Sequence, residues 1–426
     1  MANRYWVGGT GSWTSVSTTN WSTSSGGTGG ASVPTTSDAV FVTSLSGSPT
    51  ITMTGALNCA SFDSTGATCT LTSSGSLTCA GSFTLSTTTT ATAWSGGLTI
   101  TGTSTITTNG RTVNCTLTLN GTGATYTLAG NTIFGQGSSN NVTLTQGTLN
   151  LAGFSLTCTT FNSNNSNTRV IAFSTTGSIV INPSVSGGFS MNSSTGFSFT
   201  GTSLITTSGL ATSVSITTNA SSITQTLNFT LNSSSATYSE AIGNQYRNLT
   251  VTSGTLPNST RIIYGNMNTA SGCTLTAGSN TTSFVAPSGT VTITSNTKTW
   301  DFPLFFGASG STAIYSIVNA LTQGSTRSFT HSFGTIQLTS GTTLTVGTFA
   351  TSGSTLKYLT SSTSGSQATI TQASGTVNAT YLSIQDSNAT GGAIWNAFTS
   401  NNNVNVSNNT GWIFTATVVN KFFLLF

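Results

Sequence analysis

The sequence predicts an all-β protein, a β-solenoid (β-helix) with an N-terminal aromatic cap and a distinct C-terminal β section. Short runs that alternate apolar residues with Thr, Ser or Asn recur along the chain, and turn dipeptides such as Asn109-Gly110 separate them. Internal similarity is the third observation, since residues 57–76 and 77–97 both open on Leu-x-Cys-Ala and soon reach a Phe. A period of about 15–22 residues fits one coil of two or three short strands.

The composition fits such a coil and excludes several classes of protein. Only 3% of the 426 residues are charged, whereas about 25% is usual. The formal net charge of +4 is spread over the whole chain, so we expect no nucleic-acid partner. The hydrophobic share of 35% also separates the chain from disordered segments, which have low hydrophobicity and high net charge.

The coil geometry assigns each residue type a place. Each coil adds its strands to the coil below, so one side of a strand faces a narrow core and the other faces water. We expect Leu, Ile, Val, Phe and Cys inside, Thr, Ser and Asn outside, and Gly at the corners. Residues 1–45, rich in Trp and Gly, are interpreted as a cap or attachment segment, 46–298 as the repeats, and 299–426 as a C-terminal β section with a terminal cap and an apolar tail.

The cysteines are predicted to be core residues. They are Cys59, Cys69, Cys79, Cys115, Cys158 and Cys273. No two are close enough in sequence for a typical zinc site, so we expect no metal and no cofactor. The first three are evenly spaced among apolar and hydroxyl residues, which favours buried thiols stacked in a ladder, with disulfides as the alternative.

The sequence predicts a non-enzymatic protein. Its carboxylates are Asp38, Asp63, Glu240, Asp301 and Asp386, and no two are close in sequence, whereas a glycosidase needs two that face each other. Four of them precede an apolar strand or lie in an Asp-Ser turn, where a carboxylate caps the turn. The lone His331 is expected on the surface of a strand. Thr-x-Thr runs would suit ice binding, but they do not recur at one fixed period, so we interpret them as the outer faces of strands.

Exposed aromatic side chains are the candidate ligand-binding residues. Trp94, Trp300, Trp395 and Trp412 each lie next to Gly, Ser, Asn or Asp. An indole ring can stack on a sugar ring, and neighbouring hydroxyl and amide groups can supply hydrogen bonds. Packing in the core or in a cap is the alternative for each of them, and it is the one that we favour.

The end of the chain is apolar. Phe422, Phe423, Leu424, Leu425 and Phe426 are candidate contacts between subunits of an oligomer. No segment approaches the length of an apolar membrane-spanning helix, and the first residues lack the apolar stretch of a secretory signal peptide, so we expect no membrane insertion.

Both ends of the chain carry recurring motifs. The N-terminal motif consists of Tyr5–Gly9, Gly11–Trp13, Asn20–Ser22, Gly29–Pro34 and Asp38, and the C-terminal motif of Tyr381–Trp395 followed by Asn408–Trp412. These motifs resemble the two ends of a group of predicted structural proteins of tailed bacteriophages, and residues 57–85 resemble the coils that follow in that group. The Trp, Asn-Trp, Val-Pro and Asp pattern is also similar to repeat heads of bacterial autotransporter passenger domains.

The phage resemblance implies a function and a location. It implies a non-enzymatic virion protein, a tail fibre, spike or similar appendage, whose partners are other virion proteins and a glycan or receptor on the host surface. Phage fibres and spikes are often trimers, so it also implies a homo-oligomer. Two alternatives stay open: a bacterial adhesin or self-assembling filament subunit at the cell surface or outside the cell, and a capsid decoration fibre.

Overall fold

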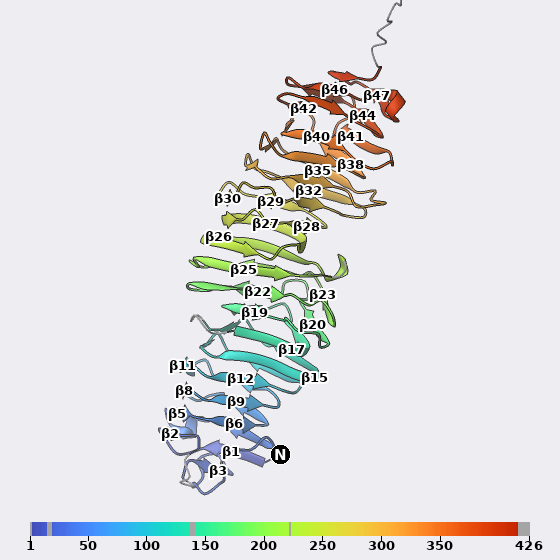
Figure 1. Ribbon diagram of the computed structural model, residues 1–426. Coiled ribbons are helices and arrows are strands. Elements are labelled where there is room, and N and C mark those ends of the chain that lie inside the picture. Colours follow the sequence, from blue (N-terminus) through green and yellow to red (C-terminus); the bar gives the residue numbers. More distant parts are fainter. Residues whose placement is uncertain (1, 15–18, 136–140, 221–222, 416–426) are drawn as a thin grey trace, which may run out of the picture. The chain divides into compact units, whose positions relative to one another are not determined.

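The predicted β-solenoid is confirmed. The computed structural model describes residues 2–14, 19–135, 141–220 and 223–415, almost all of them in strands, turns and loops. The chain forms a β-solenoid of about 16 turns. It divides into two compact units, Met1–Ala241 and Ile242–Phe426. In each unit the strands of successive coils lie side by side in parallel (Figure 1).

The first unit has three walls, which we name A, B and C. Wall A contains β1 (Ala2–Trp6), β4 (Asp38–Phe41), β7 (Ser61–Asp63), β10 (Phe83–Thr84), β13 (Ser104–Thr107), β20 (Arg169–Ala172) and β23 (Phe197–Thr200). Wall B contains β2 (Gly11–Ser12), β5 (Thr50–Met53), β8 (Thr70–Ser73), β11 (Thr90–Trp94), β14 (Thr112–Val113), β16 (Thr132–Phe134), β18 (Ser155–Cys158), β21 (Ser178–Ile181) and β24 (Ile205–Thr207). Wall C contains β6 (Ala56–Cys59), β9 (Ser76–Cys79), β12 (Gly97–Ile100), β19 (Thr160–Asn162), β22 (Ser186–Met191) and β25 (Ser213–Thr218).

Three long strands turn a corner of this unit and serve two walls. These are β15 (Thr116–Leu128) and β17 (Asn141–Asn150), shared by walls C and A, and β26 (Leu227–Glu240), shared by walls B and C. The remaining elements are β3 (Trp21–Ser22), which is antiparallel to β1, and two short 3-10 helices, η1 (Ser44–Ser46) and η2 (Ile223–Gln225).

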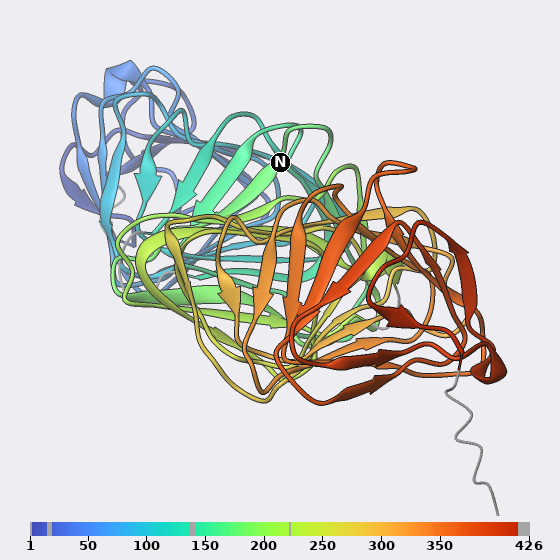
Figure 2. The same cartoon turned by 90° about the horizontal axis from the view of Figure 1, so that it is seen from above.

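The second unit has walls D, E and F, and its strands run along closed coils when seen from above (Figure 2). Wall D contains β28 (Arg261–Ile263), β31 (Thr282–Phe284), β34 (Leu304–Phe306), β37 (Ser328–His331) and β40 (Thr348–Thr351), with β43 (Thr376–Asn378), β46 (Ile394–Asn396) and β48 (Trp412–Ile413) adjoining β40. Wall E contains β29 (Met267–Thr269), β32 (Thr290–Thr294), β35 (Ile314–Ile317), β38 (Thr335–Leu338), β41 (Lys357–Ser361), β44 (Leu382–Gln385) and β47 (Val404–Ser407). Wall F contains β33 (Thr299–Trp300), β36 (Leu321–Gln323), β39 (Thr343–Val346), β42 (Ala368–Gln372) and β45 (Ser387–Thr390), and β30 (Cys273–Leu275) comes before them along the chain. The long β27 (Asn244–Leu256) pairs with β28, β29 and β30, and η3 (Thr399–Asn401) precedes β47.

Inward-facing side chains form ladders because parallel pairing places each residue over its partner in the next coil. One ladder of wall C consists of Leu57, Leu77, Leu98, Leu117, Val142, Phe161, Phe189 and Ile216, all buried. In wall D the rings of Phe284 and Phe306 stack nearly parallel, with an angle of 4° between their planes and centroids 5.0 Å apart. Burial of such apolar rings contributes favourably to the free energy of folding of this narrow core.

Outward-facing residues form hydroxyl and amide rows. In wall C the row consists of Asn58, Thr78, Thr99, Thr118, Thr143, Asn162, Ser190 and Thr217. In wall F it consists of Thr299, Thr322, Thr345, Thr371 and Thr390. Thr99 pairs with Thr118, 19 positions later, but Asn162 pairs with Ser190, 28 positions later. Some coils are therefore longer than the predicted 15–22 residues, and the extra residues lie in loops between strands, so the rows stay in register.

The predicted segment boundaries at 45 and 298 stay predictions. Parallel pairing continues past 298, because β34 pairs with β31, and it extends as far as β48. The boundary between the two compact units lies between residues 241 and 242.

Gly96 tests the close approach of successive coils at a corner. A Cβ atom added to Gly96 would lie 1.7 Å from the backbone oxygen of Gly75, which the parallel pairing holds in place. We expect Gly96→Ala to lower the free energy of unfolding by about 3 kcal/mol, measured by urea denaturation followed by circular dichroism. Gly130→Ala is the matched control, since nothing lies within 4 Å of its added Cβ. Equal losses in the two variants would contradict this account of the corner.

Candidate binding surface

The four candidate tryptophans are buried, so the alternative of core or cap packing is confirmed and they are not exposed binding residues. Trp94 in β11 and Trp300 in β33 are both 0% exposed. Trp94 lies 6.1 Å from Phe83 and Trp300 stacks on Phe284 with ring centroids 6.5 Å apart. Polar neighbours in sequence did not reveal this, because alternate residues of a strand face opposite sides. In this structure these indoles are not available for stacking on a ligand.

Trp395 and Trp412 close the core of the second unit at its last coils. They are partners in register, and their ring centroids lie 5.0 Å apart, with Phe349 at 6.0 and 6.4 Å. The indole N–H of Trp395 donates to the carbonyl of Thr390, and that of Trp412 donates to the hydroxyl of Ser387. These two residues of the C-terminal motif therefore have structural roles.

Three tryptophans close the first unit in the same manner, which confirms the predicted aromatic cap. Trp6, Trp13 and Trp21 are buried, and Trp21 meets both others edge-on at 5.1 and 4.9 Å. The ring of Trp13 stacks on that of Phe62 in β7, with centroids 6.3 Å apart. The antiparallel pairing of Trp6 with Trp21 folds the segment back over the first coil.

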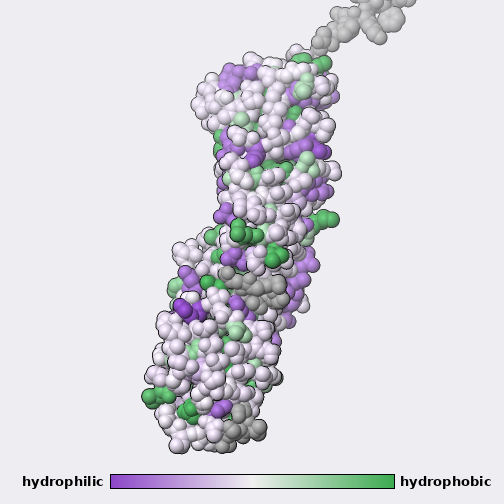
Figure 3. All heavy atoms as spheres, turned by 90° about the vertical axis from the view of Figure 1, so that its left-hand side faces the viewer, coloured by the Kyte–Doolittle hydropathy of each residue, from purple (hydrophilic) through white to green (hydrophobic). Residues whose placement is uncertain are grey.

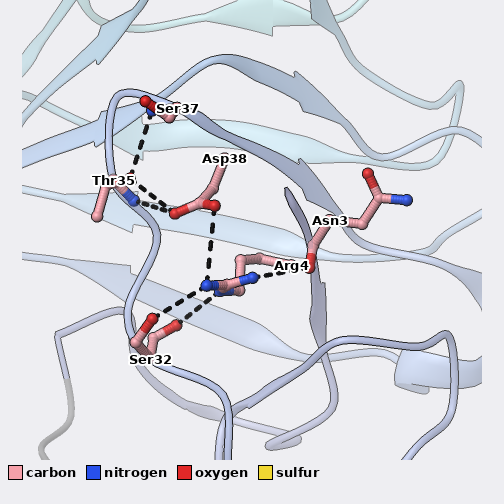
Figure 4. A network of polar contacts seen from close by, with 6 residues as sticks. All are labelled: Asn3, Arg4, Ser32, Thr35, Ser37 and Asp38. Carbon is pink, nitrogen blue, oxygen red and sulfur yellow. Dashed lines mark hydrogen bonds and ion pairs between the residues drawn. The ribbon is translucent and has the colours of Figure 1, made fainter. Parts of the chain in front are cut away.

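An ionic network fixes the N-terminal strand to the loop before β4 (Figure 4). The carboxylate of Asp38 accepts hydrogen bonds from the amide and the hydroxyl of Thr35, at 2.9 and 2.7 Å. The guanidinium of Arg4 lies 3.8 Å from this carboxylate and donates to the carbonyl and hydroxyl of Ser32. Burial acts to raise the pKa of Asp38, but the hydrogen bonds from Thr35 and the charge of Arg4 outweigh it, so the pKa is lowered.

The other described carboxylates also have structural partners. Asp63 accepts from the amide of Thr65 at 2.7 Å, which confirms the predicted turn. Asp301 pairs with Arg327 at 2.6 Å, and Asp386 accepts from the amide group of Asn408 at 2.7 Å. Glu240 ends β26. Within the described ranges, no group of three or more His, Cys, Asp or Glu residues is placed to hold a metal ion.

The cysteines are buried thiols, as predicted, and all six are free. Cys59 and Cys79 are partners in wall C, so they form the predicted ladder. Cys69 does not belong to it; its sulfur lies 3.5 Å from the hydroxyl of Thr89. Burial raises the pKa of Cys158, which keeps this thiol protonated and unreactive.

Three of the cations lie inside the coils, which sequence reasoning missed. Arg169, Arg261 and Lys357 are each 0% exposed. Each lies over an aromatic ring of a later coil: Arg169 over Phe197, Arg261 over Phe302 and Lys357 over Tyr381, at 5.7, 5.9 and 5.8 Å. Backbone carbonyls accept their hydrogen bonds; Arg169, for example, donates to the carbonyls of Asn167 and Thr195, at 2.8 and 2.7 Å. Because these three cations are buried, the surface carries even fewer charges than the composition alone indicates.

His331 is buried, so its predicted place on the surface of a strand is wrong. It occupies an inward position of β37, in register with Phe306 and Thr351. Its Nε2 lies 3.2 Å from the carbonyl oxygen of Gly334. Burial lowers the pKa of His331 to about 3, so the ring is neutral at pH 7.

The outer surface is largely near-neutral in hydropathy on the face in Figure 3. Among its hollows, a groove and a cleft differ in the side chains that line them. A groove of about 460 Å³ lies on wall C, where Gly188 leaves the outer row without a side chain; residues around it include Thr160, Ser190, Ser215 and Thr217. A cleft of about 280 Å³ lies in the second unit, between walls D and E. It differs from the groove in carrying exposed aromatic and aliphatic side chains, Tyr358 and Leu356.

Comparison of the chain with models of protein families, with curated proteins and with solved structures finds no match. Across the described residues there is no helix of the length and apolarity that a membrane crossing requires.

Asp38 tests the cap network. Because the folded-state pKa of Asp38 is lowered, its stabilising contribution is present above the unfolded value of about 3.9 and is lost as the pH falls through the folded value. We expect Asp38→Asn to lower the free energy of unfolding by about 2 kcal/mol at pH 7 and by much less at pH 3, measured by urea denaturation. Asp301→Asn, in a partly exposed pair, is the control and should cost less than about 1 kcal/mol. A loss for Asp38→Asn that is equal at both pH values would contradict the assignment.

His331 makes the second unit sensitive to acid. The unfolded chain binds a proton at His331 below about pH 6.5, whereas the folded chain binds it only near pH 3, so stability falls as the pH drops between these values. We expect a slope of up to about 1.4 kcal/mol per pH unit from this residue. His331→Phe should remove this pH-dependent contribution, so that the free energy of unfolding changes less with pH in the variant. Any effect of the Phe ring itself should be the same at every pH. Urea denaturation at pH 4, 5, 6 and 7 measures both curves, and parallel curves would overturn the prediction.

Proposed function

We propose that this chain is a non-enzymatic structural protein of a tailed-phage virion, a fibre, spike or similar appendage that contacts the host surface. The observation that carries the proposal is the pair of end motifs that resemble such proteins. Trp6, Trp13 and Trp21 of the first motif and Trp395 and Trp412 of the second are all buried where coils end. Their role in closing the coils gives the motifs a structural rather than a chemical meaning.

The physical properties of the coils suit a passive, exposed appendage. Hydrogen bonds between successive coils stiffen each unit without a cofactor or a metal. The chain has few charges, and several of those in the described residues are buried or paired. Contact with another surface would therefore depend on shape and hydrogen bonds rather than on long-range attraction. Assembly as a homo-oligomer belongs to the proposal. The candidate subunit contacts Phe422 to Phe426 lie outside the described residues.

A bacterial adhesin or filament subunit is the second candidate. The strand β47 favours it, because all four of its residues are exposed and β44 is the strand with which it pairs in the described part of the chain. An open strand edge is a site where a strand of another subunit can add. A capsid decoration fibre would share the virion but occupy another position in it.

Purified particles distinguish these candidates. Phage that encode the chain are banded in a density gradient, their proteins are identified by mass spectrometry, and antibody against the folded chain is located by electron microscopy. We expect the chain in intact particles, at a projecting part of the tail. A label on the capsid would support the decoration fibre. Abundant chain in infected cells but none in particles would refute the virion proposal, and filaments of the chain alone would support the second candidate.

A further inference from the structure

We propose that the cleft between walls D and E binds a neutral saccharide through Phe333 and Tyr358. Its biological source, a glycan of the host surface, rests on the proposed function, but the binding itself does not. The cleft is lined by three successive coils at the same corner: residues 310–312, 333–335, and 355, 356 and 358.

The cleft presents aromatic and aliphatic surface to solvent. Tyr358 is 44% exposed and Leu356 37% exposed, and Phe333 is half-buried beside them. Large side chains with this exposure are uncommon along the outer rows, which carry mainly Thr, Ser and Asn. Two rings in one concave place can contact the apolar face of a sugar ring.

The backbone holds both rings in place. The amides of Ser332 and Phe333 both lie within hydrogen-bond distance of the carbonyl of Phe306, at 2.9 and 3.4 Å. Gly307 permits this approach, because a Cβ there would lie 2.4 Å from the backbone oxygen of Phe333. The amide of Tyr358 donates to the carbonyl of Gly334 at 3.1 Å. A rigid site loses less conformational entropy when it binds a ligand than a mobile loop does.

The polar groups of the cleft indicate an uncharged ligand with many hydroxyls. Thr312 and Thr355 are exposed and Thr335 is half-buried, whereas no charged residue is among those that line the cleft. Lys357 adjoins Tyr358 in sequence, but its amine is buried and donates to the carbonyl of Thr380 at 3.1 Å. Aromatic faces beside hydroxyl donors and acceptors, without charge, fit a neutral saccharide better than a peptide or an anion.

An array of oligosaccharides tests the proposal with the purified full chain. The array carries neutral hexose and N-acetylhexosamine oligosaccharides and acidic ones of similar length, and calorimetry measures the affinity of each compound that binds. We expect binding to neutral members of the array. Tyr358→Ala and Phe333→Ala should each weaken it by roughly tenfold or more, and Tyr358→Phe should retain it because the ring remains.

Ile394→Ala is the matched control, since Ile394 is 52% exposed in the same unit but does not line the cleft. It should leave the affinity unchanged, and circular dichroism checks that every variant is folded. Absence of binding to every neutral oligosaccharide, binding to acidic ones alone, or equal affinity in the Ala variants and the control would each overturn the proposal. If the chain is present in virions but binds no saccharide, the proposed binding by the cleft is refuted and the proposed function is not. If the chain binds saccharides but is absent from virions, the proposed function is refuted and the binding by the cleft is not.

Discussion

Parallel pairing between successive coils is the constraint on which the rest of the structure depends. It fixes which residue lies over which, so a side chain that enters the core must fit the side chains of the coils before and after it. In wall D, Phe284, Phe306 and His331 follow one another in a single inward row. The imidazole of His331 lies in this inward row, and its low pKa follows from burial there rather than from a role in chemistry.

The same constraint explains where the charges lie. Strand carbonyls pair with the next coil, but corner carbonyls need another donor, and a buried polar group without a partner is costly. Arg169 and Lys357 supply several donors each, and an aromatic ring covers each cation. Because these charges are used inside, the outer surface offers hydroxyls, amides and a few rings. Recognition by such a surface depends on stacking and shape.

Pattern and composition predicted the coil, the aromatic cap and the stacked thiols of Cys59 and Cys79, because each depends on residue type repeated from coil to coil. They did not predict which side of a strand a residue faces when its neighbour in sequence is polar. Trp300 stands before Asp301 and was for that reason a candidate binding residue, yet it faces the core. Tyr358 was missed for the converse reason: it adjoins Lys357, and a lysine is normally taken as the outward residue of a pair, whereas here the lysine is buried and the tyrosine exposed.

Corners are the part of a coil where new chemistry is easiest to place. A change at Phe306 would disturb Phe284 and Phe329, because their rings stack with its own at 5.0 and 4.7 Å. Tyr358 faces outward as the second residue of β41, close to the corner between walls D and E, so its ring can change without altering the core ladder beneath it. Unequal coil lengths show the same freedom, since added residues lie in loops and leave the strands in register. A stack of coils can therefore keep its stability in the inward rows while its corners diverge in what they bind.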